Sequence, residues 1–395
     1  MPAKKMQNTD VLIVGGGIVG GSLAIDLAEA GFSVTVVDFA SAVTTDIQPK
    51  VFSARVSAIS AASEAYFRKL NIWQNIQRKQ AYTDMQVWDK DGFGQIEFSA
   101  QEMQSEHLGH IIENDLIVAA LNDKMATMSN IQLLLGVSVE QIQEIDAGYS
   151  LQLSNQQQIT GSLLVGADGA NSQIKAQMGF SETFWDYEHT AIVANVRTEI
   201  AHDNTARQGF TPFGPLAFLP LADPFQCSIV WSQKTKRASE LLGLSEDEFC
   251  KALLVDIDNQ LGLVSLTTER FSFPLRMRYT RQWTKLHVAL VGDAAHTIHP
   301  LAGQGANLGL SDAQTLAELL IQSKDKYPVG HNKILRNYER KQKAEAMKTI
   351  ATMEGFKQLF DGDNPMKKLV RNLGLLAANK VSPVKEFFIK QAAGN

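Results

Sequence analysis

A run of glycines directly after a short apolar stretch is the feature that most limits how this chain can fold. Residues 11–14 are typical of a buried strand, and Gly15, Gly17 and Gly20 follow them as G-x-G-x-x-G before a helical pattern over 22–30. Glycines at this spacing let a pyrophosphate approach the N–H groups at the start of the helix. The pattern therefore predicts the βαβ opening of a parallel α/β sheet that binds a dinucleotide.

An acidic residue at the end of the next predicted strand narrows the choice of dinucleotide. Asp38 follows the apolar residues 34–37, at the place where a carboxylate accepts hydrogen bonds from ribose hydroxyls. A carboxylate there disfavours a 2′-phosphate, so we expect FAD or NAD rather than NADP. The alternative is that the glycines serve only the close packing of strand on helix.

Two later segments repeat the pattern of an apolar stretch followed by a glycine-rich turn. Residues 166–172 include Asp168, and residues 292–307 begin with Gly-Asp at Asp293 and run into a helical pattern. A second helix N-terminus with flexible glycines can receive the edge of a flavin ring, and Asp293 can hydrogen-bond a ribityl hydroxyl. We therefore expect separate parts of the chain to meet in one binding crevice.

The rest of the pattern predicts a discontinuous nucleotide-binding domain with a β-rich insertion. With 395 residues the chain exceeds the usual size of a single core. We assign residues 1–180 and 276–335 to the nucleotide-binding domain, 181–275 to a β-rich substrate domain, and 336–395 to a helical, basic C-terminal region. A further helical pattern is expected over 57–80.

Composition limits the class and the surroundings of the protein. The net charge of −5 hides a basic segment, since residues 331–395 carry 13 Lys and Arg against 6 Asp and Glu, or +7. The two cysteines, Cys227 and Cys250, indicate neither a disulfide framework nor a zinc site, which favours the cytoplasm. No apolar run approaches the roughly 20 residues of a membrane span, so any contact with the inner face of the membrane would be peripheral. We expect no nucleic-acid partner.

The basic C-terminal segment has two interpretations. The more economical one is a solvated helical face. The other hypothesis is that residues 341–395 attach the protein to an anionic membrane or to a biosynthetic complex.

The three glycine-bearing segments together resemble the class A flavoprotein aromatic hydroxylases, which are built like para-hydroxybenzoate hydroxylase. The resemblance implies a Rossmann-like α/β FAD-binding domain with an inserted β-rich substrate domain and a helical C-terminal tail. It implies that Arg55 lies beside the flavin, that Asn114 lies near the ribityl chain, and that residues 303–307 approach the isoalloxazine ring. Carried over by position, the FAD-binding residues would be Gly15, Gly17, Gly20, Asp38, Arg55, Asn114, Asp168, Asp293, Gly303, Gln304, Gly305, Ala306 and Asn307.

Within that family the run GDAAHTIHPLAGQGANLGL, at 292–310, resembles the ubiquinone-biosynthesis branch. Segments 87–91, 108–114, 183–187 and 217–221 are most similar to the bacterial 2-polyprenylphenol hydroxylases, which add the C5 oxygen of the ring. The resemblance spans essentially the whole chain. It implies a monooxygenase that uses FAD, O2 and an electron donor, either NAD(P)H or a redox protein, to hydroxylate a polyprenylphenol through a flavin C4a-hydroperoxide. Sister hydroxylases for other ring carbons share most of these features, and we expect a homo-oligomer.

Two positions qualify what the resemblance implies. Lys175 stands where the family often has Arg, and because Lys lacks the planar fork of Arg, tight NAD(P)H binding by this route is not expected. His296 and His299 could suggest a metal pair, but a catalytic zinc site generally needs three protein ligands and no third one is suitably spaced. We therefore assign no metal ligands, and we assign no general base.

Aromatic residues of the predicted substrate domain have two readings. Trp185, Phe213 and Phe218 could line a prenylphenol pocket, but most aromatic residues of a β-rich domain belong to its core, which is the interpretation we favour for each.

Two other functional classes share the FAD motifs. One is a flavin dehydrogenase that passes electrons to a quinone, and the other is a non-enzymatic dinucleotide-binding regulator, which would have little need for the full 292–307 run.

Overall fold

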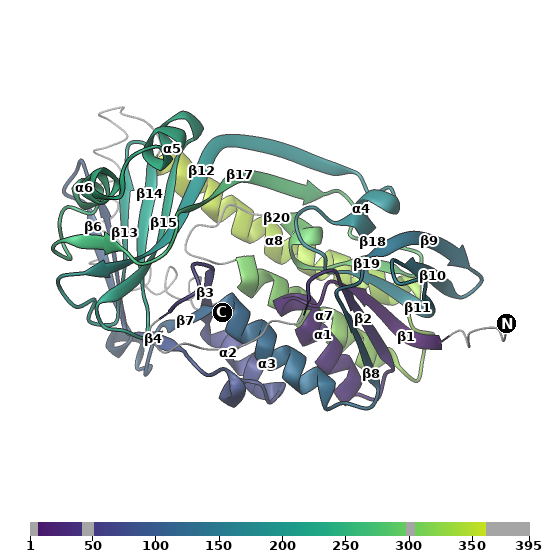
Figure 1. Cartoon of the computed structure of the whole chain (residues 1–395). Coiled ribbons are helices and arrows are strands. Elements are labelled where there is room, and N and C mark those ends of the chain that lie inside the picture. The colour runs from purple at the N-terminus through teal and green to yellow at the C-terminus, as the bar shows by residue number, and fades with distance from the viewer. Residues whose placement is uncertain (1–6, 42–50, 298–304, 361–395) are drawn as a thin grey trace.

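Two large β-sheets lie toward opposite ends of an elongated molecule in the computed structural model (Figure 1). The structure describes residues 7–41, 51–297 and 305–360. The long strands β12 (Glu182–Thr198) and β17 (Phe271–Thr280) run between the two ends.

The first sheet is an eight-stranded nucleotide-binding sheet with a parallel centre. Its parallel strands, in spatial order, are β19 (Val288–Leu290), β11 (Gln158–Gly166), β1 (Gln7–Val14), β2 (Val34–Asp38) and β8 (Ile131–Leu135). Antiparallel additions are β18 (Thr284–Lys285), β10 (Gly148–Leu153) and β9 (Val139–Ile145). The central strands are mostly buried, whereas β8 is half-buried. Because β1, β11 and β19 pair in parallel, their carboxyl ends meet at one edge of the sheet.

Helices cover this sheet and carry the turns that matter for function. They are α1 (Ile18–Glu29), α3 (Asn114–Ala126), α4 (Gln173–Gln177), α7 (Gly305–Ser323) and α8 (Asn332–Phe360). Helix α1 packs against both α3 and α7. Its contact with α7 needs a glycine, because a Cβ at Gly309 would lie 2.6 Å from the Val19 side chain. The N-termini of α1 and α7 thereby come close together.

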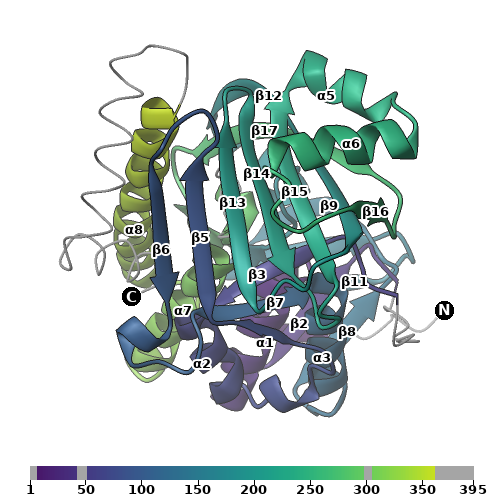
Figure 2. The same ribbon diagram turned by 90° about the vertical axis from the view of Figure 1, so that its left-hand side faces the viewer.

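The second sheet has nine strands and is mostly antiparallel. Beside β12 and β17 it contains β20 (His296–Thr297), β15 (Gln226–Lys234), β14 (Gly214–Pro220), β13 (Thr205–Thr211), β5 (Asp84–Asp89), β6 (Gln95–Ser99) and β16 (Val264–Leu266). Helices α5 (Thr235–Leu242) and α6 (Glu246–Asp256) cover one face (Figure 2), where Trp231 packs edge-on against Phe249. Strands β5 and β6 thus join this sheet from a distant part of the sequence.

A small three-stranded sheet lies between the two large ones. It consists of β3 (Val56–Ser60), β7 (Gly109–Glu113) and β4 (Gln80–Tyr82), and helix α2 (Ala61–Lys69) follows β3 directly. Short 3-10 turns are η1 (Trp73–Asn75), η2 (Gln101–Met103) and η3 (Gly292–Ala294). The fully buried Asn195 of β12 donates hydrogen bonds to the carbonyls of Phe52 and Ser53, which fixes the approach to β3 against the second sheet.

The predicted α/β fold with a β-rich second part and a helical C-terminal part is confirmed, but the helical pattern over 57–80 is wrong at both ends. Residues 57–60 belong to strand β3, which pairs with β7, and only α2 is an α-helix in this range. Pairing with a strand some 50 residues away overrides the local pattern. Ser60 then stops the strand, since its Oγ accepts a hydrogen bond from the Ser63 N–H and caps α2.

The aromatic residues of the second sheet and the basic C-terminal segment were the subject of two further predictions. Phe218 is buried in the core of the second sheet, as we favoured, whereas Trp185 and Phe213 are about half exposed, so the core reading is wrong for these two. Most of the basic segment, residues 361–395, lies outside the described residues, and the hypothesis that it attaches to a membrane stays a prediction. Within the part of the chain that the structure describes, no helix is both long enough and apolar enough to cross a bilayer.

Candidate active site

The glycines after β1 divide into two that pack tightly and one that faces open space. The backbone of Gly15 has φ +105°, and a Cβ there would lie 2.3 Å from the Ala167 carbonyl oxygen. A Cβ at Gly20 would lie 1.9 Å from the Gly15 carbonyl oxygen. A Cβ at Gly17, by contrast, would meet no protein atom within 4 Å. Gly15 and Gly20 therefore shape the turn, and Gly17 borders a space that a ligand can fill.

The start of α1 suits a pyrophosphate. Gly17 is its N-cap, no side chain caps the helix, and its first turn contains no acidic residue. Asp38, at the end of β2, stands beside it: its Oδ2 accepts from the Gly16 N–H at 2.6 Å and its Oδ1 from the Ala40 N–H at 2.8 Å. Each carboxylate oxygen keeps further acceptor capacity. This arrangement fits phosphate oxygens at α1 and ribose hydroxyls at Asp38.

The turn after β11 offers an unsatisfied carboxylate oxygen. Asp168 Oδ2 accepts from the Ile174 N–H at 3.1 Å, while its Oδ1 is buried and has no hydrogen-bond partner among the described residues. The Ala167 N–H donates to the Val14 carbonyl at 2.8 Å, so this turn lies against the glycine run. A buried acceptor without a donor is costly, and a ligand hydroxyl would satisfy it.

Lys175, the departure from the family pattern, holds this same turn from inside the protein. It is buried, forms an ion pair with Glu182 at 2.6 Å, and donates to the Ala170 carbonyl at 3.3 Å. Arg278 of β17 donates to the same carbonyl at 2.9 Å and to Asn171 Oδ1 at 3.0 Å. The Lys175 ammonium is thus committed to the protein's own backbone and carboxylate.

A buried charge pair supports the turn after β19. Asp312 of α7 is fully buried, and its Oδ2 accepts from the Gly292 N–H at 2.8 Å and from His296 Nε2 at 2.6 Å. The indole of Trp283 packs on the His296 ring at 4.7 Å between centroids. Burial by itself would lower the pKa of His296, but the Asp312 carboxylate outweighs it and raises that pKa above its ordinary value. An imidazolium–carboxylate pair therefore fixes the backbone on both sides of Asp293.

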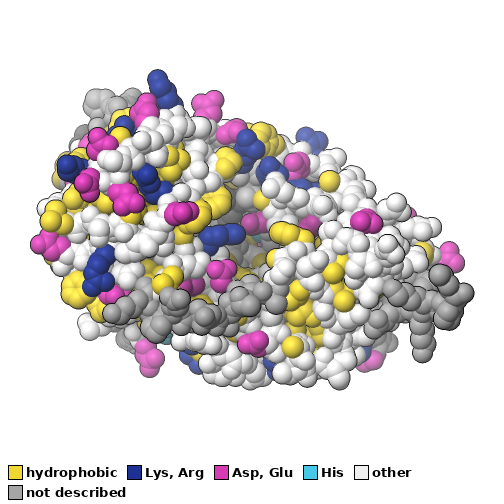
Figure 3. Space-filling model, in the orientation of Figure 1, with side chains coloured by type: hydrophobic (Ala, Val, Ile, Leu, Met, Phe, Trp, Pro, Cys, Tyr) yellow, Lys and Arg dark blue, Asp and Glu magenta, His cyan; other side chains and the backbone are white. Residues whose placement is uncertain are grey.

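Asp293 belongs to the short turn η3, and the space-filling view shows a hollow between the two lobes of the molecule (Figure 3). Its side chain is exposed, yet the surrounding protein desolvates it enough to raise the pKa of the carboxyl, with His296 and Arg55 acting in the opposite direction. The Arg55 guanidinium lies 6.0 Å from the centre of the Phe273 ring of β17.

The two predicted asparagines clamp strand β3 from either side. Asn307, in the first turn of α7, donates from Nδ2 to the Ala58 carbonyl at 2.8 Å and accepts the Ser60 N–H at 3.0 Å. Asn114, at the start of α3, accepts from the Ser57 hydroxyl at 2.7 Å. Both polar atoms of the Asn307 amide and the oxygen of the Asn114 amide therefore hold β3, the strand that directly follows Arg55.

The structure thus brings together most of the residues that the sequence singled out, with Gly305 and Ala306 at the start of α7 beside Asp293. Gly303, Gln304 and His299 lie outside the described residues. Sequence reasoning missed Asp312, Arg278 and Phe273, which belong to no motif. For Asp312 a signal existed: it is an acidic residue on the apolar face of α7, and such a residue is rarely buried without a partner.

This fold and crevice define an FAD-dependent flavoprotein. A family model described as an FAD binding domain matches residues 8–352, most of the chain, so the protein belongs to that family. The solved structure of p-nitrophenol 4-monooxygenase PnpA from Pseudomonas putida DLL-E4 has the same fold, with a TM-score of 0.80 at 18% identity over 98% of both chains. The predicted cofactor, FAD, and the predicted class, an FAD-dependent monooxygenase, are confirmed.

Relatives place the chain more narrowly within the family. The 3-demethoxyubiquinol 3-hydroxylase of Escherichia coli K12 is 34% identical over 398 residues, which cover 98% of this chain and 99% of that protein. The ubiquinone biosynthesis monooxygenase COQ6 of Danio rerio is 32% identical over 430 residues, covering 95% of this chain and 88% of that protein. The chain therefore belongs to the branch of FAD-dependent monooxygenases that includes the ubiquinone-biosynthesis hydroxylases.

Proposed function

We propose that this enzyme hydroxylates the aromatic ring of a polyprenylphenol on the route to ubiquinone, at C5. The observation that carries the proposal is similarity over nearly the full length to ubiquinone-biosynthesis monooxygenases of bacteria and animals. The choice of C5 rests on segments 87–91, 108–114, 183–187 and 217–221. A second candidate, a sister enzyme acting at another ring carbon, is favoured by the printed name of the E. coli relative, a 3-hydroxylase.

The crevice offers an apolar wall opposite the proposed flavin position. Phe271 and Phe273 of β17 are each more than two-fifths exposed, and among the described strands this part of β17 pairs with β12 alone. An aromatic ring would pack against this wall near Arg55, which lies 6.0 Å from the Phe273 ring and acts electrostatically on Asp293. The nearby guanidinium would favour the phenolate form of the substrate, because an opposite charge lowers the pKa of a phenol.

The contacts proposed for FAD follow from the open positions of the site. Gly17 and the N-terminus of α1 take the pyrophosphate, Asp38 takes the ribose, and Asp168 and Asp293 take hydroxyls nearer the ring. The start of α7, with Gly305 and Ala306, faces the ring itself. When bound, FAD supplies the chemistry that activates O2, with electrons from NAD(P)H or a reduced redox protein. The protein holds the phenol at the flavin edge and keeps water away from it.

Deletion of the gene in its host tests the ring position. We expect a prenylphenol that lacks the C5 oxygen to accumulate and ubiquinone to fall, because the steps before this enzyme continue while its product is missing. Mass spectrometry of extracted lipids measures both, and a plasmid copy of the gene serves as the control that restores them. Accumulation of an intermediate that already carries the C5 oxygen would replace C5 by another carbon.

A further inference from the structure

A cluster of metal-ligating side chains lies outside the crevice, beside helix α2. Glu64, in the first turn of α2, is buried, and two histidines reach it, His107 from the segment before β7 and His110 from β7 itself. Glu64 Oε2 is hydrogen-bonded to His107 Nε2 at 2.8 Å, a contact that a bound metal would replace, and lies 3.1 Å from His110 Nδ1. All three potential ligand atoms lie within 4.8 Å of one another. The FAD account uses none of these side chains.

One of these atoms has no partner. His110 is nine-tenths buried, and its Nδ1 makes no hydrogen bond within the described part of the chain, because its approach to Glu64 Oε2 is not aligned for one. The Trp73 ring holds the imidazole edge-on at 4.9 Å, so the nitrogen cannot easily turn to solvent. An unpaired nitrogen therefore faces a carboxylate oxygen across a gap that a cation would bridge.

We propose that Glu64, His107 and His110 bind one Zn²⁺ ion. Zinc bonds to imidazole nitrogen and carboxylate oxygen at about 2.1 Å, which places neighbouring ligands of a tetrahedron about 3.4 Å apart. The two separations from Glu64 Oε2, 2.8 and 3.1 Å, are shorter than that edge, so the side chains would move slightly apart to admit the ion. Two histidines and a glutamate are an established zinc ligand set, and water would complete the fourth position.

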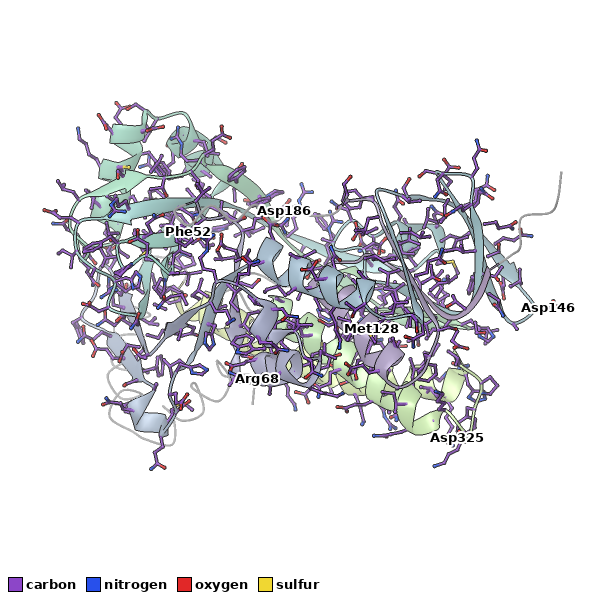
Figure 4. All side chains as sticks on the ribbon, turned by 60° about the horizontal axis from the view of Figure 1, so that its bottom comes forward. Phe52, Arg68, Met128, Asp146, Asp186 and Asp325 are labelled. Atoms are coloured by element: carbon purple, nitrogen blue, oxygen red, sulfur yellow. The ribbon has the colours of Figure 1, made fainter. Side chains whose placement is uncertain are left out.

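Two cations near the cluster decide which metals it can hold. Arg68, labelled in Figure 4, binds Glu64 through Oε1 and leaves Oε2 to the histidines; its side chain is 59% exposed, so its charge is screened by water. Lys79 Nζ donates to the carbonyls of Trp73 and Ile76. Both positive charges repel a metal ion, so the cluster would hold only a metal that bonds strongly to its ligands. Imidazole ligands favour Zn²⁺ over Mg²⁺ or Ca²⁺.

Arg68 also resembles the outer hydrogen-bonding partner that orients a metal-binding carboxylate. Bound zinc would join α2 to the segment before β7. Because α2 begins at the Ser60 cap of β3, the ion would stabilise the framework on which Arg55 is presented, without touching the cofactor. Zinc binding is therefore independent of the proposed hydroxylation and can be measured without it.

The test is a titration of the tag-free, FAD-loaded protein, freed of metal by dialysis against chelator, with ZnCl2 in a calorimeter. We expect one Zn²⁺ per chain, verified by elemental analysis, and a higher melting temperature with zinc. Variants His107→Gln and Glu64→Gln should lose at least roughly tenfold in zinc affinity, since even outer partners of a metal site contribute that much. His331→Gln, a change at a histidine stacked on Tyr327 in another part of the surface, is the matched control.

Retained FAD absorbance and an unchanged circular dichroism spectrum show that each variant is folded. His107 is the safer of the two positions, because its side chain is 20% exposed. The proposal is overturned if the wild-type protein binds no zinc, or if His107→Gln and Glu64→Gln bind it as tightly as His331→Gln.

Discussion

Replacing Gly17 by alanine is expected to weaken FAD binding at least tenfold, about 1.4 kcal/mol, while the apoprotein folds as before. A Cβ at this position meets no protein atom within 4 Å, and φ of −68° is ordinary for alanine. The only neighbour that the methyl group can disturb is the ligand that fills the space. The loss at the helix N-cap should cost the apoprotein less than about 1 kcal/mol.

Gly20→Ala is the informative contrast. Its Cβ would lie 1.9 Å from the Gly15 carbonyl oxygen, so the turn itself must shift, and both the stability of the apoprotein and FAD binding should suffer. Gly243→Ala, at the end of α5 and away from the crevice, controls for glycine replacement in general. FAD titration by fluorescence quenching and urea unfolding of the apoprotein measure the two effects. Wild-type FAD affinity in Gly17→Ala would contradict a pyrophosphate at this helix.

Replacing Asp312 by alanine is expected to lower the free energy of unfolding by about 3–5 kcal/mol, the usual cost of removing one partner from a buried charge pair. A single oxygen, Oδ2, accepts from both the Gly292 N–H and His296 Nε2, and both residues of the ion pair are almost wholly buried. The change leaves a buried imidazole and a backbone donor without partners. Urea unfolding of the FAD-free protein measures it, and a loss below about 1 kcal/mol would contradict the structural role of the pair.

The pH dependence of the same pair has a definite sign. The folded-state pKa of His296 is raised, so the folded protein holds a proton that the unfolded chain, with a histidine pKa of about 6.5, releases more readily. The stabilisation by the protonated His296 is therefore complete below the histidine pKa of the unfolded chain. It is lost as the pH rises through the raised pKa of the folded protein. The difference in the free energy of unfolding between the wild type and Asp312→Asn should become smaller from pH 6 toward pH 9. A gap that widens over this range would show that His296 is neutral in the folded protein.

Sequence reasoning succeeded where function depends on backbone that only certain residues can form. The φ of Gly15 and the close contact at Gly20 leave glycine as the residue that fits, so their spacing reveals the turn. Asp38 was predictable for a related reason, because the end of the second strand is fixed once the first βαβ unit is placed. The parallel centre of the nucleotide-binding sheet follows from the same unit.

The parts that escaped prediction depend on contacts between residues distant in the chain. Strand β3 carries a helical pattern locally and becomes a strand because β7 pairs with it. The contact of Asn307 with β3 could not be predicted, because no local pattern gives the position of that strand. Glu64 and His110 lie 46 residues apart, on α2 and β7, and their contact exists only after both pack together.

Incorporation of oxygen from labelled O2 tests most directly whether this protein is a monooxygenase of a prenylated phenol. The purified enzyme, loaded with FAD and supplied with a reductant and a short-chain prenylphenol, is incubated under ¹⁸O2 in ordinary water, and the product is examined by mass spectrometry. The account predicts one ¹⁸O atom in a new ring hydroxyl, and none when the label is in the water instead. An unlabelled product, or oxidation of the ring without a new oxygen, would contradict it and identify a flavin dehydrogenase.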